Sequence, residues 1–342
     1  MGKLRVLNDE VIRELLDFRR VLSLVEQAYS LKSSGEGSVF PLIVHDFEPE
    51  KADMDIKSGY LKGDINVFGL KLVSWFGDNV KRNLPALNGT IMVFDGETGL
   101  PLGLLTASYI TCLRTGAAGG VAIKHLARQD SERLLLIGTG HQALYQLAGA
   151  VAVSKVRKVM VYDPLDYQSS VSFCRGAESR LDTILAFHDS AQASQLQLEP
   201  VRDIERAVGQ ADIIVTVTPS RKPLIKREWL QRGTHLNCIG SDMEGKQEID
   251  EAIFSIARIF VDDLSQAIKV GEVEIPLKKG VIELEDIVGE IGDVILGKLP
   301  GRTSDEDITV FDSTGIALQD LVTAKHVLEL AEEKQLGTVI DY

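Results

Sequence analysis

The chain has 342 residues, of which 44% are hydrophobic and 25% are charged, a composition typical of a globular protein with room for two domains. Its net charge of −13 argues against nucleic acid as a partner, because phosphate backbones bind to basic surfaces. We expect a cytoplasmic protein with no membrane partner, since no stretch is apolar enough to span a bilayer and the first residues carry no signal peptide. The three cysteines and six histidines lack the spacing of metal ligands, so no metal site is predicted.

The first third of the chain predicts an α+β unit. Apolar residues at helical spacing indicate a helix over residues 9–35, where Gly35 ends the pattern. From about residue 38 to residue 108, short β-rich runs alternate with turns, as is typical of antiparallel strands. A helix rich in small residues is expected over residues 107–127.

The middle of the chain predicts a doubly wound α/β domain, because buried strands alternate with helices. The expected strands are residues 133–137, 158–162, 182–187, 212–217, 234–239 and 258–262. A helix over 283–297, a strand over 308–313 and a last helix over 315–335 follow. We expect that last helix to return to the first domain.

Residues 133–163 carry the most informative pattern of the chain. Gly138, Gly140 and Ala143 form G-x-G-x-x-A between an apolar strand and a helix. The first glycine permits a tight turn, the second lets the backbone approach a pyrophosphate, and the alanine lets the helix pack closely on the strand. Asp163 ends the next strand, where a carboxylate accepts hydrogen bonds from ribose hydroxyls and repels a 2′-phosphate. The pattern predicts NAD as the cofactor, and an α/β turn without a ligand is the alternative.

Several further motifs occur together along the chain. They are GLKLVSWFGDN (69–79), NLPALNGTIMVFDGETG (83–99), LRTGAAGG (113–120), LLIGTGHQA (135–143), IGSDMEGKQEID (239–250) and VFDSTGIALQD (310–320). With these motifs the chain resembles the ornithine cyclodeaminase/μ-crystallin family over nearly its whole length. The resemblance implies a Rossmann domain of residues 126–307, inserted into an α+β domain of residues 1–125 and 308–342 that binds substrate and forms a homodimer. It also implies hydride transfer between a nicotinamide and the α-carbon of an amino acid or its imine.

Three residues match family positions that handle the substrate. Lys71 matches the catalytic lysine of the family, and a lysine on a solvated sheet face is the alternative. Asp242 matches an aspartate that handles a proton on the substrate amine or on water, and a helix N-cap is the alternative. Arg114 matches an arginine that contacts the substrate carboxylate or the cofactor, and a surface or interface arginine is the alternative. We expect Lys71 and Asp242 to flank the nicotinamide.

The chain departs from the family in two places. Many members carry an arginine in the strand after the first helix, and here Lys57 is the candidate to replace that cation. The cyclodeaminase uses a glutamate to hold the distal amine of ornithine, and here Asp55 is the candidate, one methylene shorter. The shorter acid weakens the assignment of ornithine as the substrate.

The remaining candidates for cofactor binding lie beside the glycine turn or in segments that the family uses around the nicotinamide. They are Thr115, His141, Gln142, Thr216, Thr218 and Ser313. Ordinary strand propensity is the alternative for the threonines at 216 and 218. A solvent-exposed loop histidine is the alternative for His141.

The sequence therefore predicts an NAD(H)-dependent oxidoreductase that acts on an L-amino acid or the corresponding imino or keto acid, like the alanine dehydrogenases and imine reductases of the family. The second hypothesis is cyclodeamination of ornithine to proline and ammonia, which depends on Asp55. The third is a crystallin-like protein that binds nucleotide without turnover. The presence of both Lys71 and Asp242 argues against this third hypothesis.

Overall fold

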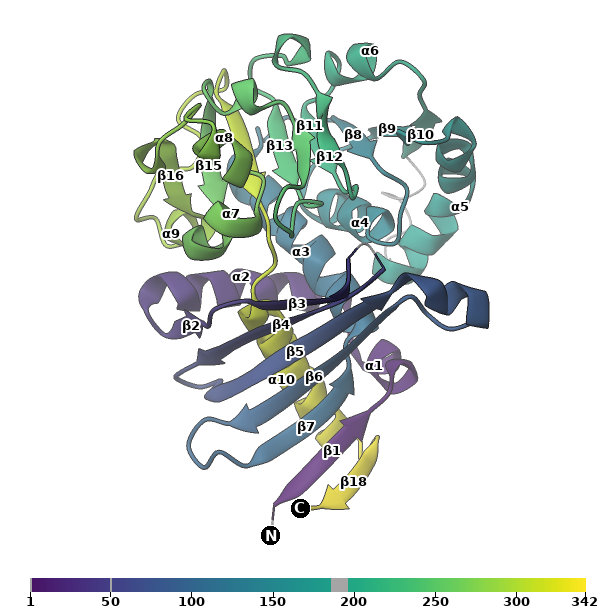
Figure 1. The fold of residues 1–342 in the computed structure, drawn as a ribbon, viewed down its shortest axis with the longest axis vertical. Coiled ribbons are helices and arrows are strands. Elements are labelled where there is room, and N and C mark those ends of the chain that lie inside the picture. Colours follow the sequence, from purple (N-terminus) through teal and green to yellow (C-terminus); the bar gives the residue numbers. More distant parts are fainter. Residues whose placement is uncertain (1, 50, 186–195) are drawn as a thin grey trace. The chain divides into compact units, whose positions relative to one another are not determined.

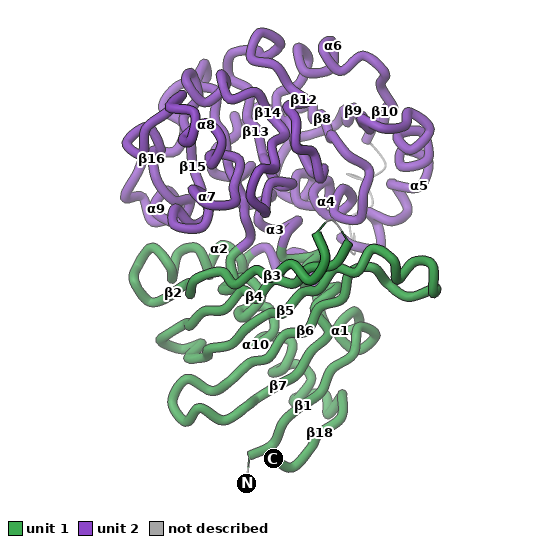
Figure 2. Tube along the Cα trace, viewed as in Figure 1, with its two compact units in different colours: residues 1–16, 23–114, 316–342 green, residues 17–22, 115–315 purple. Residues whose placement is uncertain are grey.

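The computed structural model describes residues 2–49, 51–185 and 196–342, and the chain divides into two compact units (Figure 2). The first unit contains residues 1–16, 23–114 and 316–342, and the second contains residues 17–22 and 115–315. Apart from residues 17–22, the second unit is therefore a continuous insertion into the first.

An eight-stranded sheet forms the centre of the first unit (Figure 1). Seven strands follow the order β18-β1-β7-β6-β5-β4-β2, and β3 pairs with β4. Neighbours are antiparallel except β1 and β7, which are parallel. The strands are β1 (Lys3–Leu7), β2 (Gly37–Val39), β3 (Ile43–Glu48), β4 (Ala52–Leu61), β5 (Val67–Phe76), β6 (Leu87–Asp95), β7 (Pro101–Thr106) and β18 (Thr338–Asp341). The predicted α+β unit is confirmed.

Helix α10 (Ala317–Glu333) packs on one face of this sheet and contacts β4, β5 and β6. Glycines allow the close approach. A Cβ atom on Gly59 would lie 2.9 Å from a methyl group of Leu318, and one on Gly69 would lie 2.7 Å from a methyl group of Leu321. Because side chains alternate between the two faces of a strand, Lys71 shares the face of Gly69 and points toward the helix.

The helix expected over residues 9–35 is two helices, α1 (Asp9–Leu15) and α2 (Phe18–Ser34). The Asp17 carboxylate accepts a hydrogen bond from the backbone N–H of Arg20 at 2.9 Å, in the manner of an N-cap. The periodicity of the apolar residues continues across this break, which explains why the sequence predicts one helix.

A second eight-stranded sheet forms the centre of the second unit, in the order β10-β9-β8-β11-β13-β17-β15-β16, and every pair is parallel. Its central strands are buried along their whole length, as expected for a parallel sheet covered on both faces. The strands are β8 (Arg133–Ile137), β9 (Lys158–Tyr162), β10 (Gln197–Pro200), β11 (Ile213–Thr216), β13 (His235–Cys238), β15 (Ala257–Val261), β16 (Ile287–Glu290) and β17 (Ile308–Asp312). The predicted Rossmann sheet is confirmed.

Helices and a small two-stranded sheet of β12 (Arg221–Ile225) and β14 (Gln247–Ile249) complete this part of the chain. Helix α3 (Ser108–Leu126) begins in the first unit and continues into the second. The other helices are α4 (Ala143–Val153), α5 (Tyr167–Leu185), α6 (Ile204–Val208), α7 (Leu264–Val270), α8 (Glu274–Lys278) and α9 (Ile291–Ile295). Within the described residues, none of the helices has the length and apolar character needed to cross a membrane.

Three expectations from the sequence need correction. Residues 182–185 form the end of helix α5 and not a strand, while 186 and 187 lie outside the described residues. The region 283–297 contains a 3-10 turn, β16 and α9 in place of one helix. The third correction concerns the domain boundaries. Strand β17 lies between β13 and β15, so residues 308–315 belong to the second unit, which ends at 315 and not at 307. Residues 17–22 and 115–125 also belong to the second unit.

Candidate active site

A group of buried charges lies where α10 packs on the sheet of the first unit. The ammonium nitrogen of Lys71 lies 2.9 Å from one carboxylate oxygen of Asp320 and 3.1 Å from the other. The Nε of Arg114 donates to the same carboxylate at 3.1 Å. These residues come from β5, α10 and α3, and their exposed fractions are 2%, 0% and 5%. One carboxylate thus holds two buried cations.

A third cation, Lys57 of β4, lies directly opposite Lys71 across the β4–β5 pair. Residues in this relation share a sheet face with Cβ atoms about 5 Å apart, and like charges there are destabilising. Lys57 is 8% exposed, and its charge acts on both Lys71 and Asp320. With Arg114, the four side chains carry three positive charges and one negative charge. A bound anion would offset the surplus of positive charge among these four side chains.

Burial shifts the pKa values of both partners in the ion pair. Burial, with repulsion from Arg114, lowers the pKa of Lys71 to about 8, although attraction to Asp320 opposes the shift. Burial would raise the pKa of Asp320, but attraction to Arg114 and Lys71 holds that pKa below its ordinary value. At neutral pH, therefore, Asp320 is ionised and Lys71 is an ammonium close to its titration range. Such a group is suited to exchanging a proton with a substrate.

Helix α10 holds Arg114 through a second side chain. The Oε1 of Gln319 accepts a hydrogen bond from Nη1 of Arg114 at 3.0 Å. Its Nε2 donates to the hydroxyl oxygen of Tyr29 in α2 at 2.6 Å. Two adjacent residues of one helix thus fix the plane of the guanidinium, which is the geometry required for a directed contact with a carboxylate.

Asp55 lies two residues before Lys57, on the same face of β4. Its Oδ1 is buried and has no hydrogen-bond partner among the described residues. A buried acceptor without a donor destabilises a fold, so this oxygen favours a ligand that carries a donor, such as an ammonium or hydroxyl group.

The glycine turn of the second unit has the conformation that the motif predicts. Gly138 has a φ of +103°, and a Cβ atom there would lie 2.8 Å from the carbonyl oxygen of Val217. At Gly140 no atom lies within 4 Å of the Cβ position, so the backbone faces open space. Helix α4 begins at the fully buried Ala143. An open glycine turn followed by a helix N-terminus fits the pyrophosphate of a dinucleotide.

Asp163 follows β9 and is held by its neighbours. The hydroxyl of Thr139 donates to Oδ2 at 2.6 Å, and the backbone N–H groups of Leu165 and Asp166 donate to Oδ1. Burial would raise the pKa of Asp163, but these hydrogen bonds lower it, so the carboxylate is ionised. Carboxylate oxygens can accept more than these three bonds, which leaves capacity for ribose hydroxyls.

Thr216 and Thr218 both bind Glu248, a residue that the sequence analysis did not single out. One oxygen of Glu248 accepts from the hydroxyl of Thr216 at 2.7 Å. The other accepts from the backbone N–H and the hydroxyl of Thr218 at 2.6 and 2.7 Å. The N–H of Gly240, after β13, also donates to Glu248 at 2.9 Å. Glu248 thus joins the carboxyl ends of β11 and β13, the edge where doubly wound sheets bind ligands.

A second buried carboxylate supports the same edge. Glu272 accepts hydrogen bonds from the hydroxyl of Ser241 and from the backbone N–H groups of Glu248 and Ile249. Burial and repulsion from Glu248 raise the pKa of Glu272 to about 8. Burial also raises the pKa of Glu248. This buried pair therefore retains a proton at neutral pH.

Asp242 lies in the loop after β13, with about half of its side chain exposed. Its Oδ1 lies 2.5 Å from the ammonium nitrogen of Lys246. Asp242 belongs to the second unit and Lys71 to the first. The carboxylate that the structure pairs with Lys71 is Asp320, a partner that the sequence analysis did not identify.

The other predicted cofactor residues have varied surroundings. Thr115 is buried, and its carbonyl oxygen accepts from the side chain of Gln146 at 2.7 Å. Ser313 is buried, with its hydroxyl 3.5 Å from a carboxylate oxygen of Asp262. His141 is exposed, and the partly buried Gln142 is the N-cap of α4.

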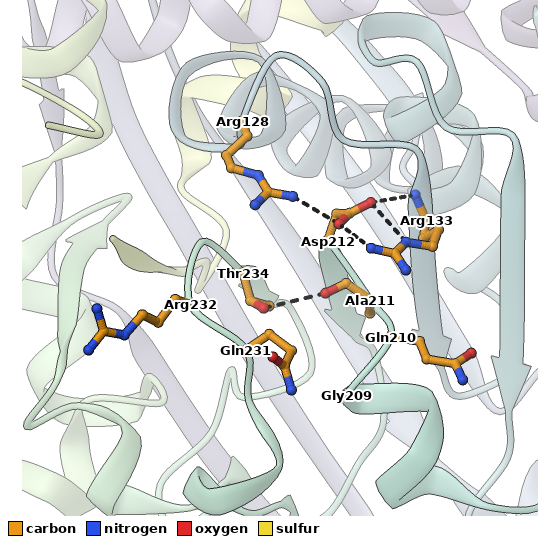
Figure 3. Close-up of a pocket in the computed structure, with 9 residues that line it drawn as sticks. All are labelled: Arg128, Arg133, Gly209, Gln210, Ala211, Asp212, Gln231, Arg232 and Thr234. Carbon is orange, nitrogen blue, oxygen red and sulfur yellow. Dashed lines mark hydrogen bonds and ion pairs between the residues drawn. The ribbon is translucent and has the colours of Figure 1, made fainter. Parts of the chain in front are cut away.

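A polar cavity of about 260 Å³ lies elsewhere in the second unit (Figure 3). It is lined by Arg128, Arg133, Gly209, Gln210, Ala211, Asp212, Gln231, Arg232 and Thr234. The Asp212 carboxylate accepts hydrogen bonds from both Arg128 and Arg133, and Arg128 also lies 3.4 Å from a carboxylate oxygen of Asp130, so two carboxylates balance two guanidinium groups within the fold. The cavity lies where β8, β11 and β13 begin, whereas doubly wound sheets bind ligands where their strands end. We therefore do not assign the reaction to it.

The sequence model of the ornithine cyclodeaminase/mu-crystallin family matches residues 4–335 of the chain. The chain belongs to this family. Alanine dehydrogenase from Archaeoglobus fulgidus is 38% identical over 339 residues, which cover 98% of each protein. The chain is also similar to a solved archaeal alanine dehydrogenase dimer with bound NAD, with 38% identity, full coverage of both chains and a TM-score of 0.90.

Two further solved structures represent other activities of the family. Iminosuccinate reductase of Paracoccus denitrificans in complex with NAD⁺ is 31% identical, with full coverage of both chains and a TM-score of 0.90. A lysine cyclodeaminase, described with the recognition of L-lysine, L-ornithine and L-2,4-diaminobutyric acid, is 26% identical with a TM-score of 0.83. That match covers 100% of this chain and 96% of the other.

Proposed function

We propose that the chain is an NAD(H)-dependent oxidoreductase that moves hydride between the nicotinamide and the α-carbon of an L-amino acid or its imine. The observation that carries the proposal is the buried surplus of positive charge formed by Lys57, Lys71 and Arg114 around Asp320. An α-carboxylate is the anion that every amino, imino and keto acid offers. The glycine turn and Asp163 fit NAD, and the similarity to NAD-bound relatives supports the same cofactor.

In the oxidative direction, amino acid, NAD⁺ and water give keto acid, ammonium, NADH and one proton. NAD supplies the hydride acceptor when it is bound. Arg114 holds the α-carboxylate with its planar guanidinium, and Lys57 and Lys71 add charge on the same side. Fixed charges of this kind orient the α-carbon and act without reorganisation of solvent.

Two groups of this chain handle protons in the proposed reaction. Asp242 accepts the proton that leaves the substrate amine, and its exposed position allows exchange with water. Lys71, with a pKa of about 8, is the second group that can exchange a proton near neutral pH. When the reaction runs toward the amino acid, the same groups return protons to the substrate.

We further propose a cytoplasmic homodimer that forms through the first unit. The sheet face opposite α10 carries the half-buried side chains of Leu70, Leu72, Met92 and Leu104, and no described helix of this unit covers it (Figure 1). An apolar face of this kind favours a protein partner. The dimeric state of the archaeal alanine dehydrogenase supports a second copy of this chain as that partner.

The proposal is tested with a substrate panel. The protein is mixed with NAD⁺ and single L-amino acids at alkaline pH, and separately with NADH and single imino or keto acids. We expect a change in NADH absorbance with at least one acid, and we expect Lys71→Met to bind NADH without this turnover. Binding of NADH without reaction across both panels would overturn the proposal and favour a crystallin-like role.

One observation favours cyclodeamination as a second candidate. The buried Oδ1 of Asp55, which has no hydrogen-bond partner in the part of the chain that the structure describes, could accept a hydrogen bond from the distal ammonium of a diamino acid. In that case L-ornithine or L-lysine would give ammonia and a cyclic amino acid without net NADH. Asp55→Asn would abolish this reaction and spare the oxidation of a monoamino acid.

A further inference from the structure

We propose that Asp320 is the positioning residue of this active site, whose single carboxylate fixes Lys71 and Arg114 side by side and keeps Lys71 in its ammonium form. The inference rests on the proposed function, since it takes Lys71 and Arg114 as the groups that meet the substrate. Asp320 itself is fully buried and acts through the two cations that it binds.

The backbone that carries Asp320 is fixed against the strand that carries Lys71. Leu321 follows Asp320 in α10, and its methyl group occupies the space over Gly69, two residues before Lys71 on the same face. Leu318 occupies the corresponding space over Gly59 of β4. These two contacts set the register of helix against sheet, so the carboxylate has little freedom to follow a moving lysine.

The Asp320 carboxylate occupies only some of the N–H donors of Lys71 and Arg114. Arg114 donates its Nε to Oδ1, while the ammonium of Lys71 lies near both oxygens. An ammonium has three N–H donors and a guanidinium has five. Contact with one carboxylate therefore leaves donors on both cations for a substrate carboxylate.

The charges around Lys71 explain why an anion is needed at this position. Lys57 faces it from β4, Arg114 from α3 and Asp320 from α10, while Ile91 of β6 opposite it is apolar. Tyr29 of α2 joins the group through Gln319. Without Asp320, three cations would share a buried place. Lys71 would then release its proton, because burial and Arg114 already lower its pKa and a guanidinium does not deprotonate in proteins.

The first test follows kcat/KM for reduction of a cyclic imino acid, which needs no added ammonia, as a function of pH. In the wild-type protein we expect kcat/KM to fall as the pH rises and Lys71 loses its proton. We expect the fall to move about 1–2 pH units toward acid in Asp320→Asn and to return toward the wild-type position in Asp320→Glu. Thr323→Val is the matched control, because Thr323 is buried in the same helix and its hydroxyl bonds to the helix backbone. If kcat/KM fell at the same pH in Asp320→Asn as in the wild type, the inference would be overturned.

The second test does not depend on activity. The free energy of unfolding is measured against pH for the wild type, Lys71→Met, Asp320→Asn and the double variant. The change in the free energy of unfolding that Lys71→Met causes depends on pH, because the pKa of Lys71 is lower in the folded protein than in the unfolded chain. We expect this dependence to begin at a lower pH in the Asp320→Asn background, and an unchanged onset would overturn the inference. An inactive wild type that shows the shifted onset would reject the proposed function and retain the role of Asp320 toward Lys71.

Discussion

Lys57 provides the most direct test of whether these buried cations bind the substrate. Unlike Lys71 and Arg114, it does not match a residue of the family motifs and is only a candidate to replace the missing arginine. We expect Lys57→Met to raise KM for the amino or imino acid and to leave kcat nearly unchanged. The physical reason is that Lys57 adds attraction for the α-carboxylate equally before and during hydride transfer. Loss of such uniform binding changes KM alone.

The size of the effect follows from the burial of Lys57 and its place opposite Lys71. Two opposite charges about 4 Å apart attract by about 4 kcal/mol at an effective dielectric constant of about 20. After desolvation, a hydrogen bond to a charged group contributes about 1.5–3 kcal/mol, which corresponds to a rise in KM of about 10- to 150-fold. Lys57 also lowers the pKa of Lys71 by repulsion, so its removal should move the fall of kcat/KM toward alkaline pH. That direction is opposite to the one expected for Asp320→Asn.

The assay is the pH series of imino acid reduction, with thermal unfolding measured in parallel to show that the variant is folded. Lys62→Met is the matched control, since Lys62 is exposed and lies five residues further along the chain. We expect the control to leave both KM and the pH profile unchanged. If Lys57→Met also left KM unchanged, Lys57 would not face the substrate and the surplus of charge would need another explanation.

Three further predictions concern other groups. With a pKa of about 8 for Lys71, kcat/KM for imino acid reduction should fall as pH rises through about 8, and Lys71→Arg should abolish that fall because arginine keeps its charge. Asp163→Ala should raise KM for NAD⁺ by about 10- to 100-fold and raise KM for NADP⁺ less, as measured by initial rates with each nucleotide. The pKa of Glu272 is raised from an ordinary value of 4.5 to about 8, so the folded protein holds a proton that the unfolded chain releases between these values. Stability should therefore decrease as pH rises across this window, and Glu272→Gln should remove that part of the decrease in urea unfolding.

Short sequence patterns predicted the features that depend on residues close together along the chain. The G-x-G-x-x-A turn requires a positive φ at Gly138, and the structure has it. The apolar runs of the second unit predicted parallel buried strands, and the sheet is entirely parallel. The family motifs also singled out Lys71 and Arg114, and the structure brings both to one carboxylate.

Such patterns could not predict contacts between side chains that lie far apart along the chain. Asp320 is 249 residues from Lys71, and no periodicity relates the two positions. A signal was nevertheless present, because Asp320 stands in the apolar segment IALQDLVTA of a helix that had to pack on a sheet. A carboxylate in such a segment is buried only with a cation or several donors, so a partner could have been sought among the strand lysines. The prediction that residues 308–313 belong to the first domain was wrong for a similar reason. The order of strands in a sheet depends on which strands pair, and this order does not follow the order along the chain.

Buried charge has different consequences in the two units. In the second unit, backbone N–H and hydroxyl donors surround Glu248 and Glu272, so the fold itself satisfies these carboxylates. In the first unit, Lys71 and Arg114 share the Asp320 carboxylate, which leaves N–H donors on both cations for a ligand. Removing a carboxylate from the second unit should therefore alter stability without any ligand present, whereas removing Lys57 should alter affinity first. Charge balance, rather than burial alone, thus separates the structural groups of this protein from those that bind its substrate.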